Sequence, residues 1–314
     1  MRFAIMLEPQ QGLSYADQLA VARQAEAAGF EAFFRSDHYQ SFPGPDTLPT
    51  TDAWTVLAGL ARETSTIRLG TLVSPVTYRL PGPFAKAVTT VDEMSAGRVE
   101  VGFGTGWHEQ EHARYGVPFP PIAERADMLE EALTIVRGLW EEPDGWSYAG
   151  AHWTITDSLF RAKPVQQPRP RILVGGSGSA RGVRIAARYA DEFNITDTKP
   201  ESIRSRYAAL DEACRAIGRD PGSITRSAMA GTLVGRDESE LARRKEAIYA
   251  GFADRAEGEA WWARHEPQWI VGSPAHARER IAALASLGVE RLMLQDFVPR
   301  DLAMIDLMGE IIAG

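Results

Sequence analysis

One short run of the sequence combines residue types that could bind a metal ion, and it spans His108 to His112 with the letters HEQEH. On a helix, the H-E-x-x-H spacing puts two histidines on one face, where they can bind zinc, with a glutamate beside them as general base. The run therefore raises the hypothesis of a zinc-dependent hydrolase.

The residues around this run weigh against zinc. A predicted strand and Gly104-Thr105-Gly106 precede it, and Gly116 ends any helix soon after, whereas zinc hydrolases carry the motif inside a long helix. A buried carboxylate at Glu111 would need a partner of its own. The candidates for a third ligand, Glu130 and Glu131, fit the solvated face of an amphipathic helix. Because such a short match recurs by chance, we expect no metal site and keep the zinc hydrolase as a distant alternative.

The elements that must position chemical groups alternate between strands and helices along the chain. Strand-like runs cover 3–7, 31–35, 67–73, 98–103, 171–174, 192–195, 224–234 and 289–294. Helix-like runs cover 15–28, 52–62, 84–94, 122–141, 180–189, 201–217, 238–250, 275–287 and 301–312. This alternation implies parallel strands with right-handed crossovers, and about eight such units in 314 residues match an α/β fold of the (β/α)8 TIM-barrel type. An open doubly wound sheet is the alternative, but residues 8–12 lack its G-x-G-x-x-G turn.

A segment rich in aromatic residues and proline interrupts the alternation at 143–169. It contains Trp146, Trp153 and Phe160, and no helical or strand-like spacing is evident in it. We expect a single TIM-barrel domain over 1–314, in which 143–169 is an insertion over the C-terminal mouth of the barrel.

The composition bounds the class of protein. A formal net charge of −8 argues against non-specific binding to nucleic acid or to an anionic membrane. The single cysteine, Cys214, excludes an internal disulfide framework and fits a reducing compartment. Residues 1–10 indicate a strand rather than a signal peptide, and no window approaches the roughly 18 apolar residues of a membrane span. We therefore expect a cytoplasmic protein with neither a membrane nor a nucleic acid as its partner.

Polar and glycine residues gather where the predicted strands end. These runs are 36–39, 73–77, 104–108, 175–179, 194–199 and 295–296. The C-terminal strand ends of a (β/α)8 barrel form the active-site mouth, so these side chains should converge there. Each also has a plain structural explanation, since Asp37 could cap a helix and His38 could be a loop histidine. The glycines at 175–178 could form only a tight turn, or could present backbone N–H groups to a phosphate.

Six stretches of the sequence match a known family in the same order. They are SDHY at 36–39, RLGTLVSPVTYR at 68–79, GRVEVGFGTGWHEQEHARYGVPFP at 97–120, ERADMLEEALTIVRGLW at 124–140, KPVQQPRPRILVGGSG at 163–178 and RYADEFN at 188–194. On these stretches the chain resembles the bacterial luciferase-like flavin and deazaflavin oxidoreductases, and within them the coenzyme F420-dependent branch. The resemblance covers most of the chain up to about residue 235 and weakens beyond it.

The resemblance implies that F420 binds at the C-terminal mouth, with FMN as the alternative cofactor. By position, His38 corresponds to a histidine beside the reactive ring carbon, which gives it the catalytic role, and Asp37 to an aspartate at the ring side. Leu72 and Val73 fall at a bulge with a non-prolyl cis peptide bond that supports one face of the ring. The other residues implied at the cofactor are Ser74, Thr105 and Gly106 near the ring, Gln110 as a holding amide, and Gly176, Gly178, Ser179 and Arg181 at the phosphate.

The sequence departs from the sugar-phosphate dehydrogenase of this family at one position. In that enzyme a glutamate follows the Thr-Gly pair and serves as an acid–base group, whereas here the residue is Trp107. We therefore expect Trp107 to wall a substrate pocket and do not carry the sugar-phosphate function over. Lys199 falls where that enzyme holds the substrate phosphate, and we include it in the pocket although its other basic partners are not evident.

Together these observations predict an F420-dependent oxidoreductase that transfers a hydride between the deazaflavin and a small, apolar organic substrate. An FMN-dependent monooxygenase that uses O2 on the same barrel is the main alternative. A protein that binds the cofactor without catalysis is a further one. The resemblance also favours a homodimer.

Overall fold

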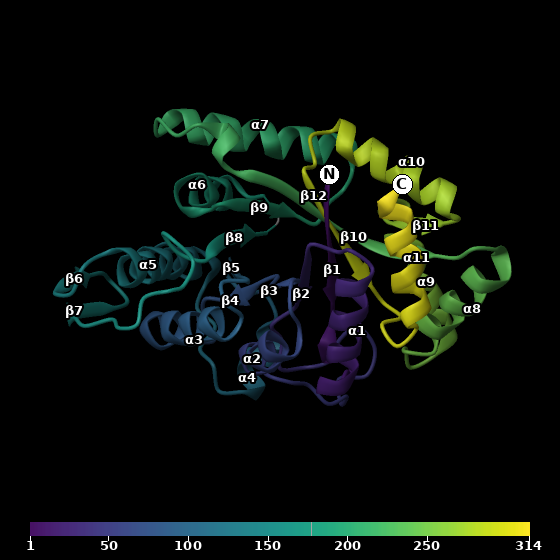
Figure 1. Cartoon of the computed structure of the whole chain (residues 1–314), viewed down its shortest axis with the longest axis horizontal. Coiled ribbons are helices and arrows are strands. Elements are labelled where there is room, and N and C mark those ends of the chain that lie inside the picture. The colour runs from purple at the N-terminus through teal and green to yellow at the C-terminus, as the bar shows by residue number, and fades with distance from the viewer. Residues whose placement is uncertain (177) are drawn as a thin grey trace.

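The computed structural model describes residues 1–176 and 178–314, and its central feature is a closed parallel barrel surrounded by helices (Figure 1). The barrel strands are β1 (Arg2–Leu7), β2 (Ala32–Arg35), β3 (Arg68–Thr71), β5 (Val99–Gly104), β8 (Arg171–Gly175), β9 (Glu192–Ile195), β10 (Thr225–Val234) and β12 (Arg291–Asp296). The remaining strands are β4 (Ser74–Pro75), β6 (Trp146–Ala149), β7 (Thr154–Ser158) and β11 (Ile270–Gly272). Because β12 pairs with β1 as well as with β10, the barrel closes, and the predicted TIM barrel is confirmed.

Helices cover the outside of the barrel. They are α1 (Tyr15–Ala27), α2 (Ala53–Glu63), α3 (Pro81–Met94), α4 (Glu109–Arg114), α5 (Ile122–Glu141), α6 (Ala180–Tyr189), α7 (Pro200–Ala216), α8 (Glu238–Tyr249), α9 (Arg255–His265), α10 (Pro274–Ser286) and α11 (Leu302–Ala313). Short 3-10 turns lie at η1 (Pro9–Gln11), η2 (Pro221–Ser223) and η3 (Glu266–Gln268). Side-chain caps start several helices, as at Ser14, Asp52 and Ser179. Within the described residues, no helix has the length and apolar character needed to cross a membrane.

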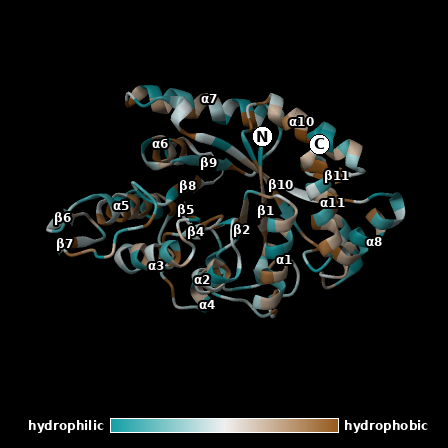
Figure 2. Cartoon of the chain, in the orientation of Figure 1, coloured by the Kyte–Doolittle hydropathy of each residue, from teal (hydrophilic) through white to brown (hydrophobic). Residues whose placement is uncertain are grey.

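Two apolar cores lie on the two sides of the strands. Ile5 and Leu7 belong to the large core between the strands and the helices, whereas Ala4 and Met6 of the same strand belong to a smaller one inside the barrel. Side chains thus alternate between the barrel interior and the helix layer along a strand. Because both faces are buried, the sequence of such a strand is apolar throughout. Figure 2 shows apolar and polar residues interleaved along the helices, as expected when one face packs on the barrel.

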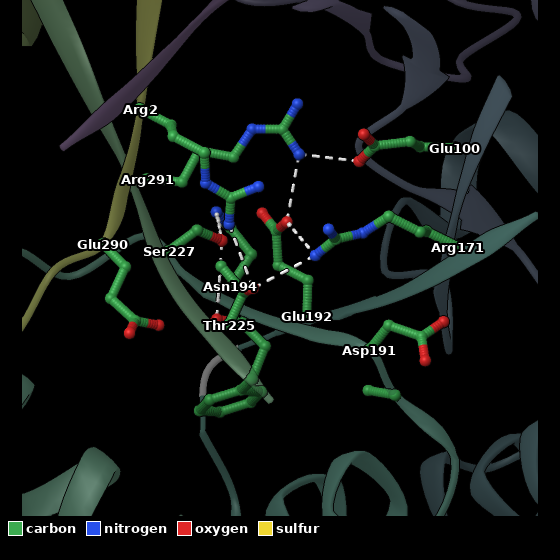
Figure 3. Close-up of polar contacts among 12 residues, drawn as sticks. Arg2, Glu100, Arg171, Asp191, Glu192, Asn194, Thr225, Ser227, Glu290 and Arg291 are labelled. Atoms are coloured by element: carbon green, nitrogen blue, oxygen red, sulfur yellow. Dashed lines mark hydrogen bonds and ion pairs between the residues drawn. The ribbon is translucent and has the colours of Figure 1, made fainter. Parts of the chain in front are cut away.

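Charged side chains fill the barrel interior at the N-terminal ends of the strands (Figure 3). Nη1 of Arg291 lies 2.6 Å from Oε2 of Glu100 and 3.0 Å from Oε2 of Glu192, and all three side chains are fully buried. Arg68 also binds Glu100 at 2.5 Å, and Arg171 lies 3.6 Å from Glu192. This cluster connects five strands at the barrel end opposite the mouth, where polar groups contribute to stability rather than to catalysis.

Residues 143–169 lie on the flank of the barrel. The β6–β7 hairpin packs beside α5, where Glu131 accepts hydrogen bonds from the backbone N–H groups of 151–153 (Figure 1). Further on, Gln166 donates to the carbonyl of Val99 at the start of β5. The expectation that this segment covers the C-terminal mouth is therefore wrong. The reason is that α5 runs antiparallel to the strands, so the chain leaves it at the opposite end of the barrel.

Candidate active site

His38 and Glu111 form a hydrogen-bonded pair at the C-terminal mouth of the barrel. His38 follows β2, and its Nδ1 lies 2.8 Å from Oε2 of Glu111 in α4. The other carboxylate oxygen of Glu111 accepts from the backbone N–H groups of Tyr39 and Gln40. An ionised carboxylate only accepts hydrogen bonds, so Nδ1 of His38 carries a proton and Nε2 is the atom that remains to exchange one.

The surroundings of this pair fix its protonation and orientation. Burial raises the pKa of a carboxyl group, but the hydrogen bond and charge of His38 and the N–H of Tyr39 hold the pKa of Glu111 below its usual range. The rings of Phe42 and Trp107 flank His38 with centroid distances of 4.6 and 5.7 Å. The imidazole is thereby held in one tautomer and one orientation, which is what a proton-transfer group requires.

The two histidines of the HEQEH run stabilise this arrangement. Nδ1 of His108 accepts from the backbone N–H of Glu111 at 3.2 Å. In His112, Nδ1 lies 2.8 Å from the carbonyl oxygen of His108, and Nε2 lies 2.7 Å from Oγ1 of Thr77. Over 1–176 and 178–314, no group of three His, Cys, Asp or Glu side chains is arranged to hold a metal ion. The zinc-hydrolase alternative therefore has no support in this geometry, because its two histidines already use these nitrogens for hydrogen bonds.

Asp37 and Ser74 lie next to the mouth, but their side chains point into the protein. Asp37 is 1% exposed, and its carboxylate accepts from Nη1 of Arg79 and from Oγ of Ser74, both at 2.6 Å. Oγ of Ser74 in turn accepts from Nε1 of Trp54 in α2 at 3.0 Å. The predicted side-chain contacts of Asp37 and Ser74 with a ring cofactor do not fit this burial. The two residues instead hold the ends of β2 and β4 against α2.

The end of β3 carries the bulge that the resemblance implied. The peptide bond between Leu72 and Val73 is cis, and both residues are partly exposed at the mouth. The Val73 side chain lies against three glycines of β5 and β8. A Cβ atom at Gly102, Gly104 or Gly175 would approach its methyl groups to 2.6–2.9 Å. These glycines therefore make room for Val73 in the middle of the mouth.

The end of β5 presents backbone and one large aromatic ring. Thr105 and Gly106 are partly exposed, and Gly106 has a φ of 76°, a backbone conformation that favours glycine. Trp107 is 63% exposed and contacts the ring of Phe42 at a centroid distance of 5.1 Å. Gln110 is exposed on α4. An exposed ring of this size beside His38 is available to a bound molecule.

The glycine loop after β8 leads directly into α6. Gly176 is exposed, and Oγ of Ser179 caps the helix by accepting a hydrogen bond from the backbone three residues on. Gly178 has a φ of 74°, and a Cβ atom there would approach Cδ of Arg206 to 2.6 Å. The loop thus combines a helix N-terminus with a close arginine, two features that attract anions.

Two arginines near this loop differ in what they are free to bind. Arg181 donates to Glu130 at 3.0 Å and also to Asp127, so its guanidinium is turned toward α5. Arg206 of α7 lies over the loop, 3.7 Å from Asp197, and its Nη1 is buried with no hydrogen-bond partner among residues 1–176 and 178–314. Arg181, which the resemblance placed at the cofactor phosphate, is thus engaged with acidic side chains of α5, whereas Arg206 lies at the loop itself. Lys199 precedes α7 and is exposed.

The sequence places the chain in a known family. The model of the luciferase-like monooxygenases matches residues 1–291. The chain belongs to the luciferase-like monooxygenase family. This agrees with the resemblance drawn from the six sequence stretches.

Relatives in this luciferase-like family use two kinds of cofactor. The F420-dependent glucose-6-phosphate dehydrogenase of Microbacterium testaceum is 30% identical over 298 residues, which is 87% of this chain and 84% of the relative. The FMNH2-dependent dimethylsulfone monooxygenase of Pseudomonas putida is 26% identical over 306 residues, covering 88% and 82%. An F420-dependent secondary alcohol dehydrogenase, solved with an F420–acetone adduct, superposes with a TM-score of 0.84 at 20% identity, covering 99% and 98%. The first two support an enzyme of the oxidoreductase or monooxygenase class, and the last supports the fold.

Two residues of this site were not predicted from the sequence. Glu111 carried a signal, because a carboxylate inside α4 that would be buried had to have a partner. The partner, His38, lies 73 positions away in the chain and could not be inferred from spacing. Arg206 carried no signal, because α7 has charged residues on much of its surface.

Proposed function

We propose that this luciferase-like protein is an F420-dependent oxidoreductase, which transfers a hydride between the deazaflavin and a small organic substrate. The observation that carries the proposal is the His38–Glu111 pair, a proton-transfer group held at the barrel mouth. Reduction of a C=O or C=N bond needs one hydride and one proton, and oxidation of an alcohol releases both. The F420-dependent relative, similar over most of both chains, supports the same choice.

The residues at the mouth fit a ring cofactor with a phosphate-bearing tail. Val73 and Gly106 are partly exposed at the mouth, and the N-terminus of α6 with Arg206 could hold an anion. On this proposal Leu72, Val73, Thr105 and Gly106 contact the ring. Gly176, Gly178 and Ser179 contact the phosphate, and Gln110 contributes from α4. Arg206 takes the place that the sequence assigned to Arg181.

When bound, the deazaflavin would supply two-electron hydride chemistry, and the protein would supply orientation and proton handling. Nε2 of His38 would give a proton to the oxygen or nitrogen of the substrate, or remove one in the reverse direction. Glu111 would stabilise the imidazolium that forms, because its carboxylate is only 2.8 Å away. Trp107 and Phe42 would keep water away from His38.

The remaining features belong to the same proposal. Trp107 would wall the substrate pocket, and Lys199 would lie at its rim. We further propose a homodimer that works in the cytoplasm. An FMN-dependent monooxygenase remains the second candidate, since the relative from Pseudomonas putida uses FMNH2 and is similar over 306 residues.

Equilibrium titration of the purified protein with F420 and with FMN tests the proposal. We expect micromolar or tighter binding of F420, and FMN binding at least about tenfold weaker, a difference of roughly 1.4 kcal/mol. The opposite order would favour the monooxygenase, and binding of neither would overturn the proposal.

A further inference from the structure

A partly open chamber lies beside His38, over the ends of β1, β9, β10 and β12. Its volume is about 350 Å³. Its lining is aromatic on one side and polar at the base. The aromatic side is formed by Phe42, Trp261, Trp269 and Phe297, and the base includes Glu8 and Gln295. The chamber adjoins the proposed catalytic group, because Phe42 both lines it and contacts the ring of His38 at 4.6 Å.

The aromatic wall is a packed unit with a fixed shape. Trp269 stacks on Phe297 at a centroid distance of 4.7 Å, and Trp261 meets both rings edge-on at 5.1 and 5.3 Å. The indole of Trp269 lies directly over Gly231 of β10, where a Cβ atom would collide with it. Because Gly231 has no side chain, the indole of Trp269 can pack directly against the end of β10. His265 donates from Nδ1 to the carbonyl of Trp261 at 2.6 Å, which orients its ring.

The base of the chamber carries a carboxylate that has no cationic partner among residues 1–176 and 178–314. Oε2 of Glu8 accepts from Nε2 of Gln10 at 2.6 Å, and Oε1 accepts from Nε2 of Gln295 at 2.7 Å. Both donors are neutral amides, so they orient the charge of Glu8 without cancelling it. The lining described above includes neither lysine nor arginine.

The charged groups behind the base form no ion pair with Glu8 within the described residues. Arg79, in the loop after β4, binds Asp37 and Asp52. Arg35, on the outer side of β2, feels the charge of Asp37 and Asp52 and, to a smaller extent, that of Glu8. The carboxylate of Glu8 therefore contacts only neutral amides, with the nearest arginine on the far side of the strand.

We propose that this chamber is the substrate subsite and that it selects a ring compound bearing positive charge over an anionic one of the same shape. Aromatic faces attract cations, and an oriented carboxylate adds to this attraction where the walls of the chamber exclude part of the solvent. An anion would meet the electron-rich faces of Trp261 and Trp269 together with Glu8, and would find no cation to bind. The inference rests on the proposed function only in taking the ligand to be the substrate.

Binding of three matched probes tests this preference without any cofactor. The probes are benzyltrimethylammonium, benzyl alcohol and benzoate, titrated at about pH 8, where an ordinary imidazole is neutral. Binding is followed by calorimetry. We expect the cation to bind about tenfold more tightly than the alcohol, and benzoate to bind most weakly. Benzoate binding as tightly as the cation would overturn the proposal.

Single substitutions test whether the preference for the cationic probe arises in the chamber. Glu8→Gln should reduce the advantage of the cation over the alcohol and leave the affinity for the alcohol within about twofold, whereas Glu142→Gln, an exposed control, should change nothing. Trp269→Leu should weaken binding of the cation more than binding of the other two probes. Trp153→Leu, on the flank of the barrel, is its control. If Glu8→Gln does not fold, as judged by its thermal transition, the Trp269 variant decides. If the folded variants keep the wild-type ratio of cation affinity to alcohol affinity, the proposal is overturned.

The F420 titration separates this inference from the proposed function. Loss of F420 binding with an intact probe ranking would contradict the cofactor assignment alone. F420 binding with an inverted probe ranking would contradict the substrate subsite alone.

Discussion

His38 depends on a residue that is distant in the sequence. Its Nδ1 is committed to Glu111, so its chemistry is confined to Nε2. The same logic explains why Asp37, the neighbour of His38, has a different role. Its carboxylate is neutralised by Arg79 and is 1% exposed, so it stabilises the loop that carries His38.

Replacing His38 with alanine should separate binding from turnover. We expect kcat to fall about 10²-fold or more, because the proton-transfer group is lost, while the Kd for F420 changes less than about threefold. Steady-state kinetics and titration measure the two quantities. His152→Ala, on the flank of the barrel, is the matched control and should leave both unchanged. A His38→Ala enzyme with the wild-type kcat would contradict the catalytic role.

After replacement of Glu111 with glutamine, the proton of His38 should no longer be fixed on Nδ1. We expect a lower kcat, because the neutral amide no longer stabilises the imidazolium, and a changed ring nitrogen spectrum of His38 in NMR. A merely structural role of Glu111 would leave the ring nitrogen signals in place.

The same substitution should change how stability depends on pH. The pKa of Glu111 is lower in the folded protein than in the unfolded chain. The unfolded state therefore binds more protons between the two values. The contribution of the pair is thus present above the ordinary pKa of glutamate and is lost as the pH falls through the lowered one. Denaturant unfolding should show a wild-type advantage over Glu111→Gln that is full at neutral pH and shrinks as the pH falls below the ordinary pKa of glutamate. An advantage independent of pH would contradict this account.

The N-terminus of α6 is the element on which the phosphate proposal depends. Arg206→Met should weaken F420 binding about tenfold, because a charge-assisted contact is worth roughly 1.5–3 kcal/mol. Arg181→Met is the matched control, because its guanidinium is already paired with acids of α5, and it should change the Kd less than about threefold. The reverse order would restore the role that the sequence assigned to Arg181.

The elements themselves were largely predictable, and their side-chain partners were not. The alternation of buried strands with capped helices was enough to predict every barrel strand. The bounds of the helices α5 and α6 were predicted to the residue. Which way Asp37, Ser74 and Arg181 point depends on partners from other elements, which no local pattern reveals. The position of 143–169 was missed for a similar reason, because its aromatic composition indicates burial but not against which face.

The whole barrel is held at its N-terminal end by the buried charges around Arg291. Arg291→Met would leave Glu100 and Glu192 buried without their shared partner, so we expect a loss of about 3–5 kcal/mol in the free energy of unfolding. Arg23→Met, which breaks an exposed pair with Glu63, is the control and should cost less than about 1 kcal/mol. Denaturant unfolding measures both. Equal small losses would show that the cluster contributes little to stability.

The barrel has a stabilising N-terminal end and a reactive C-terminal mouth. Turnover with reduced F420 tests the proposed reaction at this mouth most directly. Reduced F420 is mixed with the protein and a panel of ketones, enones and cyclic iminium compounds with oxygen excluded, and its oxidation is followed by absorbance. We expect turnover with at least one compound, at a rate that oxygen does not change. Turnover that requires reduced FMN together with O2, and fails with reduced F420, would contradict it.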